Sequence, residues 1–111
     1  MTTREENIMA NKDAIILIKS KNAYERAAGL IIVSGTRDPE LVSLIITKLF
    51  DPHVLVRVNA ARALAGTTNA EAIKALYEAA EDPVAEVRRA CLEAAPSISG
   101  CNTDELRKEA A

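Results

Sequence analysis

A spacing of 31 residues recurs along this chain and constrains its fold more than any other feature. Three kinds of landmark share the spacing, namely an arginine, an Asp-Pro pair and a glycine: Arg26, Arg57 and Arg88; Asp51-Pro52 and Asp82-Pro83; Gly35 and Gly66. Independent landmarks with one period indicate an internal structural repeat. A repeat of this length usually forms one supersecondary unit, which buries its apolar face against its neighbours.

Each repeat is predicted to be a pair of helices. Apolar residues of the first helix follow i, i+1, i+4, i+8 spacing and share one face: Leu41, Val42, Ile45 and Leu49, then Ala72, Ile73, Leu76 and Ala80. Apolar residues of the second helix recur in the same way: Val56, Ala60, Ala61 and Leu64, then Val87, Cys91, Leu92 and Ala95. Asp51 and Asp82 are expected to cap the second helices, with proline at the first helical position. Gly35 and Gly66 are expected to end helices in the left-handed conformation.

The predicted architecture is an all-α solenoid of about three helix pairs with a short C-terminal helix, because a single pair cannot bury both its faces. Seven helices are expected, at approximately 7–19, 22–34, 38–50, 52–65, 69–81, 83–95 and 103–110. The chain is expected to form one domain, residues 1–111, with repeats at about 5–35, 36–66 and 67–97 and a partial repeat at 98–111.

Composition argues against several classes of function. Apolar residues make up 49 % of the chain and aromatic residues only 3 %, which favours closely packed aliphatic helices. The net charge is −2 and the charges are interspersed, whereas nucleic-acid-binding proteins usually carry a basic stripe. The apolar run 14–18 is too short for a membrane span. Two cysteines, Cys91 and Cys101, are fewer than a disulfide-stapled secreted domain would carry, so reduced thiols and a cytoplasmic location are expected.

Catalytic and metal sites are not expected. His53 is the only histidine, and a metal or catalytic centre usually needs several partners. It is interpreted as a surface residue, and Cys91 as a small core residue. The sequence contains no Gly-rich phosphate loop and no Gly-x-Ser-x-Gly motif. No enzymatic activity, cofactor or metal is therefore predicted.

The pattern D-P-x-x-x-V-R-x-x-A-A-x-A-L at 51–64, with Gly66 before the next repeat, resembles HEAT repeats. The 31-residue period is similar to the short class found in phycobilisome lyases, and the resemblance covers roughly residues 8–99. It departs at 20–35, where Ser20-Lys21 replace Asp-Pro and Glu25 replaces valine. The resemblance implies a ladder of contacts between successive repeats, formed by four residues: Asp51, Arg57, Asp82 and Arg88.

The second helices are expected to line the concave wall of the solenoid. The predicted outward positions are Tyr24, Ala27, Ala28 and Ile31 in the first repeat, Leu55, Val58, Asn59 and Arg62 in the second, and Glu86, Arg89 and Glu93 in the third. Six of these are predicted to bind a partner: Tyr24, Ile31, Leu55, Val58, Arg62 and Arg89. A contiguous apolar set of this kind often marks an interface; alternatively, the N-terminal helix covers it. A second apolar set on the first helices could meet another copy of the chain: Ile15, Ile46, Phe50 and Tyr77.

The leading hypothesis is a non-enzymatic scaffold that binds a protein partner through the concave helical face, with a second copy of the chain as a further candidate partner. One alternative is a nucleic-acid-binding HEAT-like protein, which would need a basic wall with aromatic residues. Arg62 and Arg89 lie among glutamates and do not supply such a wall. Another alternative is an accessory or chaperone subunit of a chromophore lyase, which rests on the repeat subtype alone.

Overall fold

The computed structural model describes residues 4–95, with side chains from Asn11 onward. Six helices form this part of the chain: α1 (Arg4–Ile18), α2 (Ala23–Ile32), α3 (Pro39–Lys48), α4 (Val54–Ala63), α5 (Ala70–Ala79) and α6 (Ala85–Ala94). Residues 4–95 contain no strand. The six helices lie within three residues of their predicted ends. The seventh predicted helix, 103–110, lies outside the described residues.

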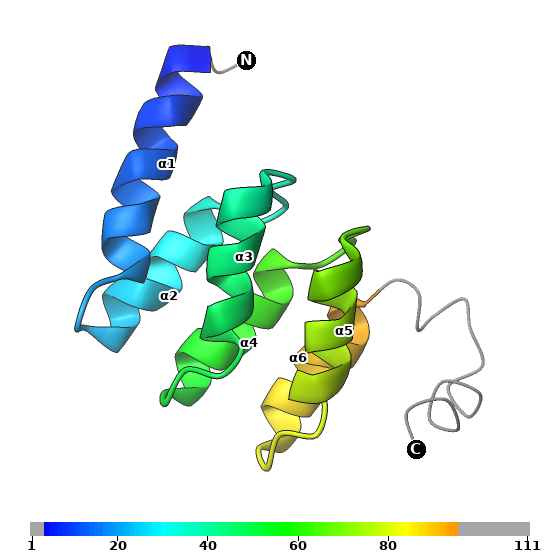
Figure 1. The fold of residues 1–111 in the computed structure, drawn as a ribbon. Helices are drawn as coiled ribbons and strands as arrows, with labels where there is room; N and C mark the ends of the chain where they lie inside the picture. The colour runs from blue at the N-terminus through cyan, green and yellow to red at the C-terminus, as the bar shows by residue number, and fades with distance from the viewer. Residues whose placement is uncertain (1–3, 96–111) are drawn as a thin grey trace.

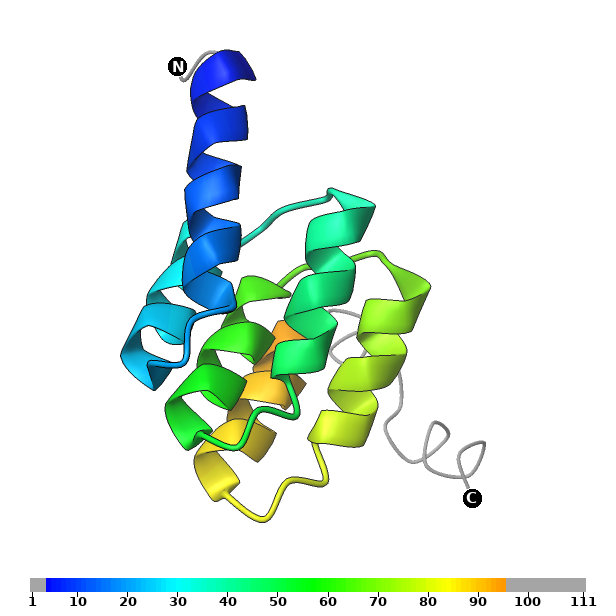
Figure 2. The same cartoon turned by 60° about the vertical axis from the view of Figure 1, so that its left-hand side comes forward.

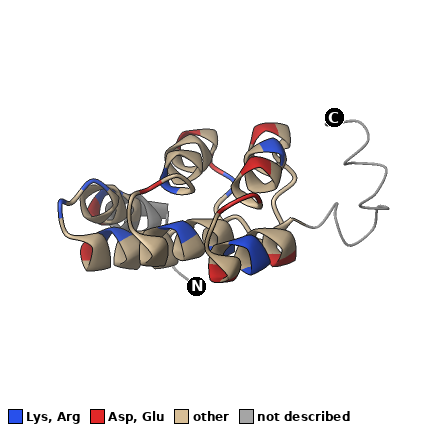
Figure 3. Cartoon of the chain, turned by 90° about the horizontal axis from the view of Figure 1, so that it is seen from below, with Lys and Arg blue, Asp and Glu red and all other residues tan. Residues whose placement is uncertain are grey.

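The helices form two layers (Figure 3). The second helices of the pairs, α2, α4 and α6, lie side by side in one layer, and α3 and α5 lie across them in the other (Figure 1). Helix α1 packs against α2, and its N-terminal half extends past the other helices (Figures 1 and 2). Each pair thus contacts its neighbours mainly through the second helices, which is the arrangement expected of a solenoid.

Aliphatic side chains between the two layers form one continuous core. Its largest fully buried members are Ile18, Leu30, Ile45, Leu49, Leu64, Leu76, Val56 and Val87, together with Cys91. Gly29 lies where α1 crosses α2, and a Cβ atom there would come within 2.7 Å of the Ala14 carbonyl oxygen. Equivalent residues, defined here as those 31 positions apart, are Ala60 and Cys91. The glycine therefore allows α1 to approach its partner helix more closely than a side chain would permit.

Two glycines join each helix pair to the next. Gly35 and Gly66 have φ angles of 82° and 77°, the left-handed conformation that glycine adopts without steric cost. The Gly35 N–H donates to the Ala63 carbonyl at 3.0 Å, and the Gly66 N–H donates to the Ala94 carbonyl at 3.1 Å. Both acceptors lie at the C-terminal end of the following second helix, so a backbone hydrogen bond links successive pairs at this edge.

The predicted capping of α4 and α6 is wrong. Asp38 does cap α3, and Pro39 follows at the first helical position, but α4 and α6 begin after His53 and Val84, two residues beyond the Asp-Pro aspartates. The aspartates instead close turns. Asp51 accepts the N–H of His53 and Asp82 accepts the N–H of Val84, each at 2.9 Å. This turn leaves each carboxylate facing the preceding repeat.

Candidate partner-binding surface

Arginine–aspartate pairs link the second helices at the edge opposite the glycines. Arg26 on α2 donates from Nε and Nη2 to the two carboxylate oxygens of Asp51, at 2.9 and 3.1 Å. Its Nη1 donates to the carbonyls of Ser20 and Lys21 in its own repeat. Bidentate pairing of this kind fixes geometry as well as supplying energy. The guanidinium therefore ties the turn before α2 to the turn before α4.

Arg57 makes the equivalent contacts one repeat further along. Its Nη1 donates to the Asp51 carbonyl at 2.8 Å, and its Nε lies 2.8 Å from Asp82 Oδ2. The Nε–H is not aligned for a hydrogen bond, so this contact is an ion pair, supported by Nη2 at 3.4 Å from Oδ1. Arg88 repeats the first half of the pattern, with Nη1 donating to the Asp82 carbonyl at 2.8 Å. All four residues of the implied ladder thus lie along this edge, and Arg26 is a further member.

The surroundings of Asp51 favour the charged form of its carboxyl group. Burial by itself would raise its pKa, but hydrogen bonds from Arg26 and from the His53 N–H, with the nearby charges of Arg26 and Lys48, keep the pKa below its ordinary value of 3.8. The side chain is almost fully buried, with 4 % of its surface exposed. Asp51 is therefore placed for structure rather than for proton transfer.

Two sets of equivalent residues on the second helices include the exposed apolar side chains of Tyr24 and Ile31. We call these six residues the wall: Tyr24, Leu55 and Glu86; Ile31, Arg62 and Glu93. Tyr24 and Ile31 on α2 are 71 % and 62 % exposed. Leu55, on the neighbouring helix α4, is half-buried. The wall is apolar on α2 and charged on α6, with a single arginine on α4. Of the predicted binding residues, Tyr24, Ile31, Leu55 and Arg62 lie on it.

Val58 and Arg89 do not belong to the wall. Val58 is only 3 % exposed, and the equivalent Ala27 is also buried. Because α2 and α4 are each followed by another second helix, this position is covered in both of them. Arg89 is exposed because no described helix follows α6. Asn59, another predicted outward residue, is also buried, and its side chain donates to the Leu55 carbonyl at 2.9 Å.

The ring of Tyr24 packs against an aromatic side chain of the next repeat. Its ring centre lies 6.2 Å from that of His53, with the rings tilted by 57°, within the range of favourable aromatic pairs. His53 caps α4, because its Nδ1 accepts the Leu55 N–H at 3.1 Å. Sequence reasoning treated His53 as a plain surface residue. Its position two residues before Leu55, the equivalent of Tyr24, was the signal that it would lie beside the wall.

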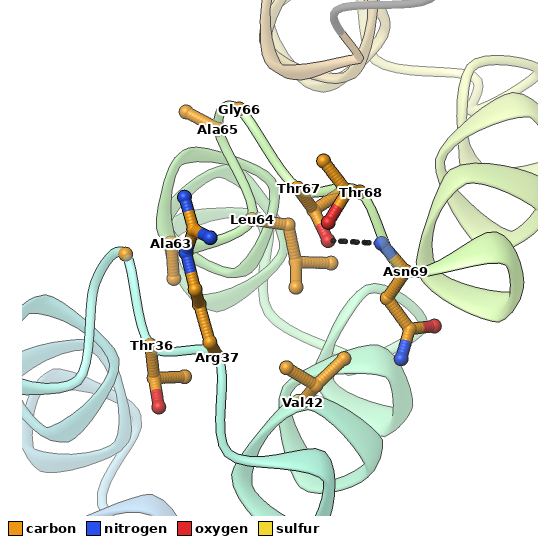
Figure 4. A pocket seen from close by; sticks show the side chains of 11 residues that line it. Thr36, Arg37, Val42, Ala63, Leu64, Ala65, Gly66, Thr67, Thr68 and Asn69 are labelled. Atoms are coloured by element: carbon orange, nitrogen blue, oxygen red, sulfur yellow. Dashed lines mark hydrogen bonds between the residues drawn. The ribbon is translucent and has the colours of Figure 1, made fainter.

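A pocket of about 270 Å³ lies between the connecting loops that follow α2 and α4 (Figure 4). Val42 and Leu64 form its apolar side, and Arg37 supplies the one charged side chain among its lining residues. The hydroxyl of Thr67 accepts the N–H of Asn69, and Thr36 does the same for Asp38, each at 3.2 Å. The threonine hydroxyls thus hold the turns, and the lining residues include no nucleophile with an adjacent base.

The cysteine within residues 11–95 is a core residue. Cys91 is fully buried, and burial raises the pKa of its thiol to about 11, so the reactive thiolate is scarce at neutral pH. Cys101 lies outside the described residues. Among the described residues, no cluster of three or more His, Cys, Asp or Glu side chains could hold a metal ion. None of the described helices is both long and apolar enough to span a membrane.

The second apolar set, on the first helices, is only partly accessible. Phe50 is 55 % exposed, whereas Ile15, Ile46 and Tyr77 pack partly against the core.

Comparison with known families identifies the repeat. A profile of the family described as HEAT repeats matches residues 13–95. The chain belongs to the HEAT repeat family. The match spans α2 to α6 and the C-terminal part of α1, so every Arg–Asp pair and glycine link described above falls within it. No curated protein and no solved structure matches the chain. HEAT repeats are in general protein-interaction scaffolds.

Proposed function

We propose that this HEAT-repeat chain is a non-enzymatic scaffold that binds a protein partner through the wall, which corresponds to the concave face of the solenoid. The observation that supports this most directly is the exposure of Tyr24 and Ile31 at wall positions where the third pair carries Glu86 and Glu93. Two large apolar side chains that remain this exposed on one surface are expected to be covered in a complex.

Charge along the wall indicates what kind of partner segment would fit. The α2 end offers apolar contacts, Arg62 offers one cation on α4, and the glutamates of α6 offer two anions. A complementary segment carries apolar side chains at one end, an acidic residue near its middle and basic residues at the other end. Electrostatic complementarity of this kind sets orientation and register more than affinity. The same charges disfavour nucleic acid, because phosphates would meet one arginine and two glutamates.

A matched pair of isoleucines tests the proposal. Ile31 lies on the wall and Ile16 lies on α1, and both are more than half exposed. Partners captured by the native chain are identified and purified, and their binding to Ile31→Asp and Ile16→Asp is compared by isothermal titration. Burying one such side chain contributes about 1.5–3 kcal/mol, so Ile31→Asp is expected to weaken binding at least tenfold while Ile16→Asp binds normally.

Circular dichroism melts must show both variants folded, because neither side chain is in the core. Equal binding by native and Ile31→Asp chains would place the interface elsewhere. Equal losses in the two variants would show that the interaction is not specific to the wall.

A further inference from the structure

Exposure differs among equivalent residues of α2, α4 and α6 in a way that defines two end faces of the stack. The C-terminal end face consists of Arg88, Arg89 and Leu92 on α6. The equivalents of Leu92 are Leu30 and Ala61, both fully buried, whereas Leu92 itself is 48 % exposed. These positions on α2 and α4 are covered by the following second helix, and on α6 they are open in the described part of the chain.

The N-terminal end face consists of Glu25, Ala28 and Ile32 on α2. All three are exposed, with Ile32 at 50 %. Their equivalents on α4 and α6, which face the preceding second helix, are buried: Val56 and Val87; Asn59 and Ala90; Ala63 and Ala94. Helix α1 packs on a different side of α2, through Gly29, and leaves this face open. Within residues 4–95, the stack therefore presents an acidic and apolar face on α2 and a basic and apolar face on α6.

Arg88, on the C-terminal end face, makes only part of the contacts that Arg57 makes. Its Nη1 is held by the Asp82 carbonyl, just as Arg57 Nη1 is held by the Asp51 carbonyl. Arg57 then uses Nε and Nη2 for the carboxylate of the next repeat. The same two nitrogens of Arg88 have no acceptor among the described residues. The guanidinium is thus already oriented for a carboxylate that arrives from beyond α6.

A carboxylate stands at the matching place on the N-terminal end face. Ser20 is equivalent to the ladder aspartates Asp51 and Asp82, and it closes the same turn by accepting the Asn22 N–H at 3.1 Å. Its hydroxyl donates to Glu25 Oε2 at 3.0 Å. The Glu25 carboxylate is therefore anchored beside the position that an aspartate carboxylate occupies in the other two repeats.

We propose that the two end faces bind each other in a second copy of the chain, so that copies stack head to tail. Arg88 of one copy pairs with Glu25 of the next, Arg89 adds a second positive charge toward it, and Leu92 packs against Ala28 and Ile32. The contact uses the helix faces that form the α4–α6 interface within one chain, with different side chains. It is heterologous, so assembly continues with concentration instead of stopping at a dimer.

A charge swap tests the proposal with the full chain. Sedimentation equilibrium of the native protein should show an average mass that rises steadily with concentration. Arg88→Glu places like charges on the two faces, as does Glu25→Arg, and each variant alone should associate at least tenfold more weakly. Mixed together, the two variants again present opposite charges at every contact, so the mixture should recover the mass of the native protein. Lys74→Glu, at an exposed position on α5, should leave association unchanged.

Circular dichroism should show all variants folded, because the altered side chains are exposed. A native chain that stays monomeric up to millimolar concentration would overturn the proposal, as would a mass that levels off at a dimer. A mixture that remains as dissociated as its components would also overturn it, because it would show that Glu25 and Arg88 do not meet.

Discussion

Removing one ladder arginine should cost a large part of the stability of the domain. Arg57 holds the Asp51 carbonyl and the Asp82 carboxylate, and the side chains of Arg57 and Asp82 are 13 % and 9 % exposed. Losing a charge-assisted hydrogen bond costs about 1.5–3 kcal/mol, and leaving a buried carboxylate without its cation adds to this. In the variant, the Asp82 carboxylate still accepts the Val84 N–H, which limits this additional loss of stability. We therefore expect Arg57→Ala to lower the free energy of unfolding by about 2–3 kcal/mol.

The equivalent Arg88 provides a matched control, because it makes the carbonyl contact but has no carboxylate partner in the described structure. Arg88→Ala should cost no more than about 1 kcal/mol, and Arg62→Ala on the wall about 0.5 kcal/mol or less. Urea denaturation of dilute protein, followed by circular dichroism, gives the three values. For a domain of 60–100 residues, about 2 kcal/mol corresponds to a fall in Tm of roughly 8–16 °C. If Arg57→Ala and Arg88→Ala lose the same stability, the carboxylate contact contributes nothing and the ladder reasoning is refuted.

Three further predictions concern single groups. The pKa of Asp51 is lowered on folding from 3.8, so its stabilisation is complete above that value and is lost as the pH falls through it toward the folded pKa; Asp51→Asn should be less stable than the native chain at pH 7, and urea midpoints at pH 7 and pH 3 should show the difference shrinking in acid. Gly66→Ala forces a side chain into the left-handed region at φ 77° and should cost about 1–2 kcal/mol, whereas Ala65→Gly, at an exposed neighbour, should cost less in the same melts. Cys91, with its buried thiol and pKa of about 11, should resist labelling by a maleimide in a Cys101→Ser background until denaturant is added; rapid labelling of the native protein would contradict its burial.

Much of the fold could be predicted because the 31-residue period determines where each helix pair begins and ends. The positions of Arg26, Arg57 and Arg88, one repeat apart, are enough to place every second helix, and the glycines mark where chain direction changes. Helix ends were less predictable. Asp38-Pro39 caps and begins α3, but the same dipeptide at Asp51 closes a turn before α4. The difference arises from a long-range partner, Arg26, which helix propensity does not include.

The error at Val58 has a different physical cause. Periodicity identifies the faces of one helix, but a second helix in a solenoid has neighbours on three sides, and only the packing of successive repeats decides which face stays open. The sequence does contain a signal that this face is covered on α2 and α4. Ala27 and Val58 are both apolar, whereas the equivalent residue on α6, Arg89, is charged. A position that is apolar on α2 and α4 and charged on α6 is typical of the polar outer face that a capping repeat carries.

Two rows of contacts join successive repeats: the Arg–Asp pairs, and the hydrogen bonds from glycine N–H groups to carbonyls. Together they constrain how the length of this protein can change. The Arg–Asp row and the Gly–carbonyl row run along opposite edges of the same helices, with the same period. A tandem duplication of residues 36–66 would supply one new member to each row and leave all others paired. An insertion of a few residues inside α3 would rotate the residues that follow it onto other faces of the helix. Growth by whole repeats therefore preserves both rows, whereas shorter insertions inside a helix do not.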